Sequence, residues 1–161
     1  MTNLKEAVQR MMGANKKEAP AVEKKRSAVD GKYVLVVDDI DVNRLILGKI
    51  LGTLGAECDM AVNGQEAVEK FENSKQGEYD LILMDIQMPL MNGYEAARAI
   101  RASAHPSAND VAIIAITANA FVDDIRAALE SGMDAHLAKP IVLDVLKSTI
   151  QEVLERRGAA Q

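Results

Sequence analysis

The stretch from Leu81 to Pro89 constrains this chain more than any other, because four consecutive apolar residues lead into one acid, Asp85, and then into a loop bounded by proline. A continuous apolar run of this length is typical of a strand buried on both faces of a parallel sheet. Ligands of such sheets bind outside the carboxyl ends of the strands. Taken alone, Asp85 is more simply a helix N-cap or an Asx turn, so other residues must decide its role.

Apolar segments alternate with amphipathic segments over most of the chain. The expected strands cover residues 33–37, 57–61, 81–84, 111–116 and 135–138. The expected helices begin near residues 42, 64, 92, 123 and 143. This alternation, with short connections, predicts an α/β fold with one parallel sheet covered by helices on both faces. The pattern does not determine the strand order, although right-handed crossovers limit it to a few doubly wound arrangements.

Apolar residues at three- and four-residue intervals predict which face of each helix is buried. In three of the helices the expected inward residues are Ile46, Leu47, Ile50, Leu51 and Leu54; Ile125, Ala128 and Leu129; and Leu143, Leu146, Ile150, Val153 and Arg157.

The length and composition limit the class of protein. The 161 residues, 48% hydrophobic and 27% charged, suffice for one globular domain with a core. No apolar run approaches the roughly 20 residues that span a bilayer, and the N-terminus lacks the layout of a secretory signal, so we expect a cytoplasmic protein without membrane contact. Cys58 is the only cysteine, which excludes an intrachain disulfide and a cysteine-based metal site.

Charge is distributed unevenly along the chain. Residues 1–32 carry eight Lys and Arg against four Asp and Glu, whereas residues 33–161 carry eleven against twenty. The acidic part is a poor partner for nucleic acid, and some of its carboxylates could hold a cation. We expect residues 1–31 to be a linker or tail with a possible short helix, residues 32–157 to be the domain, and residues 158–161 to be a tail. The possible helix is marked by Leu4, Val8, Met11 and Met12.

Polar residues of different kinds follow the expected strands. Asp38 and Asp39 follow the first, Asp85 the third, Thr117 the fourth and Lys139 the fifth. Because the carboxyl ends of parallel strands share one edge of a sheet, we expect these side chains to lie together. Three carboxylates repel one another unless a proton or a cation offsets their charge, and oxygen ligands favour Mg²⁺.

The same residues fit phosphoryl chemistry. An aspartate such as Asp85 can attack phosphorus to form an aspartyl phosphate. Lys139 would bind the phosphoryl oxygens as a point charge, and the Thr117 hydroxyl would bind them as a hydrogen-bond donor.

Four motifs in combination resemble the receiver domain of two-component response regulators, over roughly residues 32 to 157. They are Val36–Asp39, Met84–Gly93, Ile116–Ala120 and Ala138–Pro140. The resemblance implies a flavodoxin-like (βα)5 three-layer sandwich whose five-stranded parallel sheet has the order 2-1-3-4-5. It also implies that Asp85 is phosphorylated by transfer from a phosphohistidine.

The resemblance further implies a role for each site residue. Asp39, Asp85 and the backbone carbonyl of Gln87 would bind Mg²⁺, or Mn²⁺ in its place, and Asp38 would complete the acidic pocket through water. Thr117 and Lys139 would contact the phosphoryl group.

Two pairs of residues would adjust the response. Thr117 and His136 would act as the conformational switch, and Gln87 and Asn119 would set the lifetime of the phosphorylated state. His136 departs from the family pattern, because the family generally carries Tyr or Phe there. An imidazole is smaller and can titrate, so the switch could be weaker or sensitive to pH; a surface histidine with little effect is the alternative.

Three further segments are especially similar to receivers attached to hybrid sensor histidine kinases: Asp41–Arg44, Thr117–Ala120 and Gly132–Ala135. This similarity implies a histidine kinase or a histidine phosphotransfer domain as the partner, and makes the N-terminal segment an interdomain tether. We expect a monomer or weak dimer that assists its own phosphorylation and dephosphorylation and is not a conventional enzyme. If the chain is a fragment, its parent would be a hybrid histidine kinase.

Three other functions fit the sequence less well. An aspartate-nucleophile phosphohydrolase needs a second acid two residues after the nucleophile, where this chain has Gln87. A flavin-binding module of the same fold would place the flavin phosphate against Asp38 and Asp39, which would repel it. A receiver-like interaction module that is never phosphorylated is difficult to reconcile with Asp39, Asp85, Thr117 and Lys139 all being present.

Overall fold

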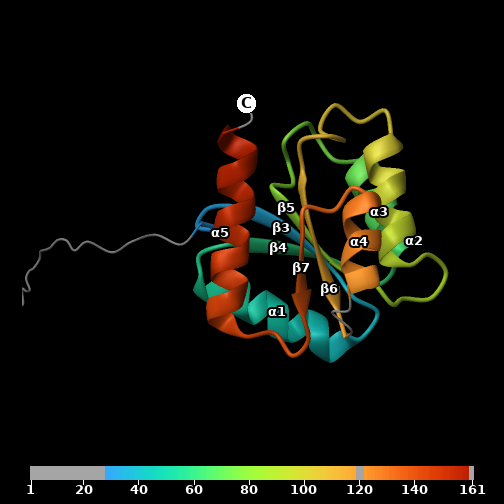
Figure 1. The fold of residues 1–161 in the computed structure, drawn as a ribbon. Coiled ribbons are helices and arrows are strands. Elements are labelled where there is room, and N and C mark those ends of the chain that lie inside the picture. The colour runs from blue at the N-terminus through green and yellow to red at the C-terminus, as the bar shows by residue number, and fades with distance from the viewer. Residues whose placement is uncertain (1–27, 119–121, 160–161) are drawn as a thin grey trace, which may run out of the picture.

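The structure, a computed structural model, describes residues 28–118 and 122–159 (Figure 1). The short helix marked by Leu4, Val8, Met11 and Met12 lies outside the described residues, and so does Asn119. Of the expected linker at residues 1–31, the structure describes only the turn at residues 28–31.

Five strands form one parallel sheet. They are β3 (Tyr33–Val37), β4 (Glu57–Ala61), β5 (Leu81–Asp85), β6 (Ala112–Thr117) and β7 (Ala135–Ala138). The spatial order is β4-β3-β5-β6-β7, and every neighbouring pair is parallel. This arrangement confirms the order 2-1-3-4-5 and the flavodoxin-like fold that the resemblance implied.

Five helices cover the two faces of the sheet (Figure 1). They are α1 (Asp41–Thr53), α2 (Gly64–Glu72), α3 (Gly93–Ala102), α4 (Val122–Glu130) and α5 (Leu143–Ala159). One buried cluster joins α1 and α5 to alternate strand residues such as Val36 and Leu83. The other joins α2, α3 and α4 to the intervening residues, such as Leu35 and Ile82. The two clusters are the two core layers of a three-layer sandwich.

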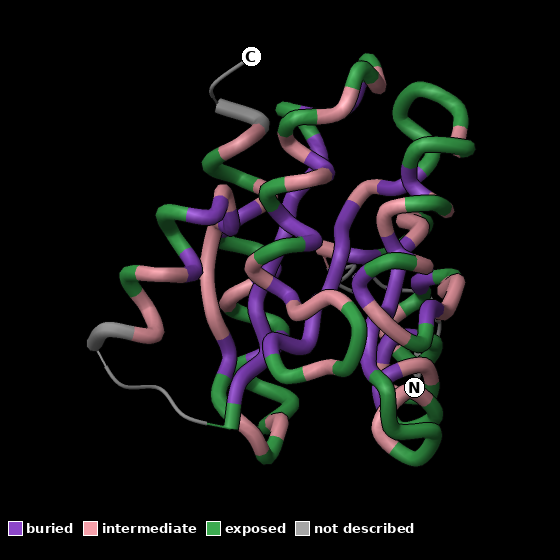
Figure 2. The backbone as a smooth tube through the Cα atoms, turned by 90° about the vertical axis from the view of Figure 1, so that its right-hand side faces the viewer, coloured by how far each residue is buried: buried purple, intermediate pink, exposed green. Residues whose placement is uncertain are grey.

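The central strands are the best-buried part of the described structure (Figure 2). Every residue of β5 and of β6 is buried, as the continuous apolar runs predicted. Strand β7, at the edge, is only partly covered. The packed region also reaches back to Val29, which is 1% exposed, and the buried residues of α5 extend from Leu146 to Val153.

Some residues that were expected on the buried faces of the helices are exposed. On α1, Leu47 and Leu51 are buried, whereas Ile46 is 49% exposed. Successive helix residues are about 100° apart, so Ile46 lies beside the buried stripe rather than on it. Leu129 on α4 and Leu143 at the start of α5 are also exposed, which corrects the same expectation there.

An ion-pair network ties the helices to the amino ends of β6 and β7. The Asp134 carboxylate accepts bonds from Arg101 Nη2 at 3.2 Å, from Arg157 Nη2 at 2.8 Å and from the Ile113 backbone N–H at 2.8 Å. Arg101 also donates to the backbone carbonyls of Gly132, Ala108 and Val111. Burial and the neighbouring Arg157 lower the pKa of Arg101 to about 10, against the opposing effect of Asp134, so it stays charged at neutral pH.

We predict that Asp134→Ala lowers the free energy of unfolding by about 3 kcal/mol, because two largely buried guanidinium groups lose their common acceptor. Urea unfolding of the variant and of a control, Glu130→Ala, measures this; Glu130 is exposed and should have little effect. A loss below about 1 kcal/mol, the scale of a surface ion pair, would show that the network contributes little.

Candidate functional site

The residues predicted from the strand ends lie together at the carboxyl edge of the sheet. Val37 pairs with Met84, Asp85 with Ile116, and Thr117 with Ala138. Asp85 and Thr117 end β5 and β6, and Asp38 and Lys139 follow β3 and β7. The register places these four residues within two residues of one level across four adjacent strands. The site is therefore built by strand register and not by any one loop.

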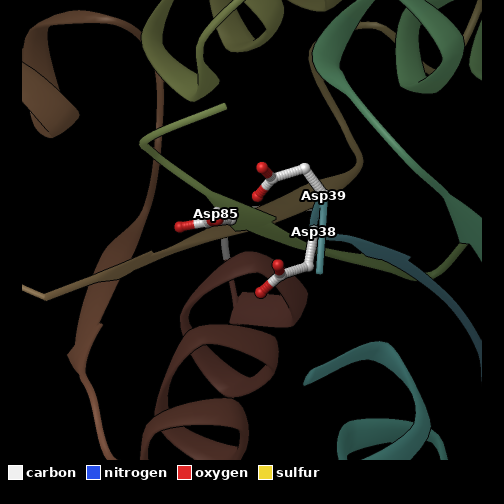
Figure 3. Close-up of side chains that lie close together, drawn as sticks. All are labelled: Asp38, Asp39 and Asp85. Atoms are coloured by element: carbon white, nitrogen blue, oxygen red, sulfur yellow. The ribbon is translucent and has the colours of Figure 1, made fainter. Parts of the chain in front are cut away.

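Three carboxylates form the centre of the site (Figure 3). One oxygen from each of Asp38, Asp39 and Asp85 lies within 4.8 Å of the others, and the group could hold a metal ion. Asp38 and Asp85 are 1% and 3% exposed, whereas Asp39 is exposed. The group thus combines two buried ligands with one open to solvent.

Lys139 provides positive charge inside the cluster. Its Nζ lies 3.4 Å from Asp85 Oδ1 and 3.6 Å from Asp38 Oδ2. Thr117, at the end of β6, is 6% exposed, and its backbone carbonyl accepts a bond from the Lys139 N–H at 2.9 Å. One ammonium group cannot neutralise three carboxylates, so the cluster remains net negative.

The Asp85 carboxyl is electrostatically strained. Burial, and then the charge of Asp38, raise its pKa above the usual value, while Lys139 and the Gln87 backbone N–H oppose the increase. The ionised form is therefore disfavoured in the folded protein. A cation placed between the carboxylates would remove this penalty.

The two carboxylate oxygens of Asp38 differ in their hydrogen bonding. Its Oδ1 accepts a bond from the Ile40 backbone N–H at 2.9 Å. Its buried Oδ2 has no hydrogen-bond partner among the described residues, although Lys139 is within ion-pair distance. A buried, charged oxygen without a donor fits a site for a hydrated dication, and the all-oxygen donor set favours Mg²⁺.

Two glycines let the loop after β5 approach the site closely. A Cβ on Gly93 would lie 2.5 Å from the Asp85 carbonyl oxygen, and a Cβ on Gly64 would lie 2.5 Å from that of Met91. Each glycine is the first residue of a helix and follows an asparagine N-cap. The sequence marks these positions as helix starts but does not show which backbone atoms lie against them.

The remaining predicted residues surround this centre. Gln87 is exposed and lines a shallow pocket of about 480 Å³ with Met88, Thr117 and Asp124. His136 is half-buried on β7, on the sheet face opposite to Leu137, which packs with α1 and α5. The structure places His136 on the α4 side of the sheet, where its imidazole has no hydrogen bond or ion pair with another described residue.

Arg44 is a site residue that the sequence did not predict. In the sequence it belongs only to the motif Asp41–Arg44, yet its guanidinium group donates to the Asp38 backbone carbonyl. A basic residue in the first turn of an amphipathic helix resembles an ordinary solvent-facing residue, and the sequence contains no signal that the side chain turns back toward the site.

Comparison with known proteins decides the family. The family model of the response regulator receiver domain matches residues 34–151. The chain belongs to this family. It is a receiver domain of two-component signalling, as the motifs predicted.

A relative and two solved structures support the assignment. The receiver is 41% identical over 126 residues, or 78% of its length, to hybrid signal transduction histidine kinase L of Dictyostelium discoideum, and it spans 7% of that kinase. It is 35% identical, at a TM-score of 0.68, to the receiver domain of a Pseudomonas aeruginosa sensor histidine kinase with a magnesium ion in its active site cleft; the match covers 77% of this chain and 98% of that one.

The second structure is a complex. The receiver domain of Ssk1 from Saccharomyces cerevisiae, crystallised with the histidine phosphotransfer protein Ypd1, matches at 35% identity and a TM-score of 0.67. The match covers 81% of this receiver and 91% of the matched chain. Within residues 28–118 and 122–159, no helix combines the length and the apolar character that a bilayer span requires.

We predict that Asp85→Asn increases the stability of the metal-free receiver at pH 7. The folded-state pKa of Asp85 is raised, so its stabilising contribution is present below the unfolded pKa and is lost as the pH rises through the folded value. The advantage of the variant should therefore shrink toward pH 4. Urea unfolding with a chelator measures it, with Asp144→Asn, an exposed carboxylate, as the control. A variant less stable than the wild type at pH 7 would contradict the assigned strain.

Proposed function

We propose that this receiver accepts a phosphoryl group from a phosphohistidine onto Asp85 and changes conformation to pass on a signal. The observation that carries the proposal is the setting of Asp85: it is 3% exposed, stands at the end of a central strand, and lies beside two more carboxylates and the Lys139 ammonium. No purely structural role explains a charge held at this cost.

Each group of the site has a part in the transfer. An Asp85 oxygen attacks phosphorus while the phosphorus–nitrogen bond to the donor histidine breaks and the imidazole takes the electron pair. Lys139 offsets charge on the phosphoryl oxygens, and the Thr117 hydroxyl donates to one of them. Asp39, Asp85 and the Gln87 carbonyl would hold Mg²⁺, or Mn²⁺ in its place, with Asp38 acting through water. The ion supplies further neutralisation of that charge.

The chain is proposed as a phosphoacceptor and not as an enzyme with a separate substrate. It assists the phosphorylation and dephosphorylation of its own Asp85. A hydrolase of the aspartate-nucleophile class would need a second acid where Gln87 stands. The similarity to a small part of hybrid histidine kinase L supports a hybrid histidine kinase as the parent, if this receiver is a fragment.

A partner that carries histidine would dock around the site. Large apolar side chains stand exposed next to the acidic residues and next to Lys139, where a solvent-facing surface would ordinarily be polar. They are Ile40, Val42, Leu45 and Ile46 at the start of α1, Leu90 after β5, and Val142, Leu143 and Val145 at the start of α5. The Ypd1–Ssk1 complex supports a histidine phosphotransfer domain, or the related kinase domain, as this partner.

Other properties of the receiver follow from the same proposal. Phosphorylation would draw Thr117 toward the site and rearrange the face of α4, β7 and α5, with His136 as a switch residue. Gln87 and Asn119 would set the lifetime of the phosphorylated state. Residues 1–31 would tether the unit of residues 32–157, residues 158–161 would form a tail, and the protein would be a cytoplasmic monomer or weak dimer that binds no nucleic acid.

Acetyl phosphate tests the phosphoacceptor function directly. We expect intact mass spectrometry to show the addition of one phosphoryl group in the presence of Mg²⁺, and none with a chelator, with Asp85→Asn or with Asp39→Asn. Asp144→Asn, which removes an exposed carboxylate away from the cluster, should be phosphorylated like the wild type. Equal addition to Asp85→Asn would refute the assignment of Asp85.

The switch role of His136 has its own test. Because an imidazole is smaller than the ring of Tyr or Phe, we expect smaller phosphorylation-linked NMR shifts in β7 and α5 in the wild type than in His136→Tyr or His136→Phe. Identical shifts in all three proteins would show that His136 has no part in the switch.

A further inference from the structure

Arg44 stands next to the acidic site, but the proposed phosphoryl transfer gives it no part. It is the fourth residue of α1, and its side chain is only 14% exposed, which is unusual for arginine on a surface helix. The guanidinium group turns back toward the end of β3. Its Nη1 donates to the Asp38 backbone carbonyl at 2.6 Å, and its Nη2 bonds the carboxylate of Asp41.

The carbonyl that Arg44 holds belongs to the peptide group between Asp38 and Asp39. A peptide group is planar, so fixing its oxygen fixes the plane from which both acidic side chains branch. Asp38 is further restrained by its bond from the Ile40 N–H, but Asp39 is exposed. The direction of the Asp39 carboxylate therefore depends on the backbone that carries it, and Arg44 is the side chain that restrains this backbone.

We propose that Arg44 is a positioning residue for the cation site: it orients the Asp38–Asp39 peptide so that both carboxylates face the ion. This inference rests on the proposed Mg²⁺ site and adds a residue to it. Arginine suits the role because two different nitrogens of its rigid fork reach two acceptors, whereas lysine offers a single point charge.

Charge and position predict opposite effects for a change at Arg44. A guanidinium group beside the acidic pair repels a dication, so its loss should strengthen Mg²⁺ binding if charge is its only influence. Loss of a group that orients a metal ligand typically weakens metal affinity by roughly 10- to 100-fold. The sign of the change therefore distinguishes the two roles.

Calorimetric titration of Mg²⁺ at constant ionic strength tests the proposal on the full chain. We expect Arg44→Gln and Arg44→Lys both to weaken binding by about 10-fold or more. A control, Lys49→Gln, removes a positive charge from an exposed position of the same helix. It should stay within about threefold of the wild type, a smaller change than the loss of a ligand-orienting group produces.

Urea unfolding in chelator separates positioning from general stability. If Arg44 positions the ligands, Arg44→Lys should lose more Mg²⁺ affinity than any decrease in its free energy of unfolding, measured in chelator, can account for. If Arg44→Gln bound Mg²⁺ as tightly as the wild type or more tightly, and Arg44→Lys matched the wild type, the proposal would be wrong. If the wild type itself bound no Mg²⁺, the proposed cation site would fail first, and this inference with it.

Discussion

The repulsion among Asp38, Asp39 and Asp85 is the constraint on which the rest of this receiver depends. Two of the three carboxylates are almost completely buried, and one lysine is the only positive group within ion-pair distance of them in the described structure. Burial and Asp38 together raise the pKa of Asp85. The fold thus holds a charge that water would stabilise better, and a cation or a phosphoryl group with its metal would relieve that strain. The chemistry of the site follows from this stored electrostatic free energy.

The architecture holds the carboxylates in place against their repulsion. Every residue of β5 and β6 is buried, so the strand that delivers Asp85 cannot shift without exposing the core. Gly93 lets the backbone before α3 lie against the Asp85 carbonyl, and Gly64 does the same for Met91. At the other edge of the sheet, Asp134 joins Arg101 and Arg157. A rigid site therefore sits above two well-packed core layers, while the exposed apolar residues around it remain free to meet a partner.

The sequence was sufficient for the features that depend on local pattern. The apolar runs located β5 and β6, and the polar residues at the strand ends located Asp38, Asp39, Asp85, Thr117 and Lys139. Strand order required the family resemblance, because periodicity carries no information on which strands are neighbours. Ile46 was assigned to the wrong surface, since spacing cannot tell how wide a stripe the sheet covers. The reach of Arg44 to the Asp38 carbonyl and the pairing of Arg101 with Asp134 depend on side-chain direction and on contacts between distant segments, so no local pattern could reveal them.

The most direct test of the central claim is a crystal structure of the receiver with Mg²⁺ and beryllofluoride, which mimics a phosphoryl group. The account predicts beryllium bonded to an Asp85 oxygen, fluorine against Lys139 Nζ and the Thr117 hydroxyl, and the metal between Asp39 and Asp85. Beryllofluoride bound elsewhere, or a metal that ignores Asp39 and Asp85, would contradict the claim that this acidic cluster is a phosphoacceptor site.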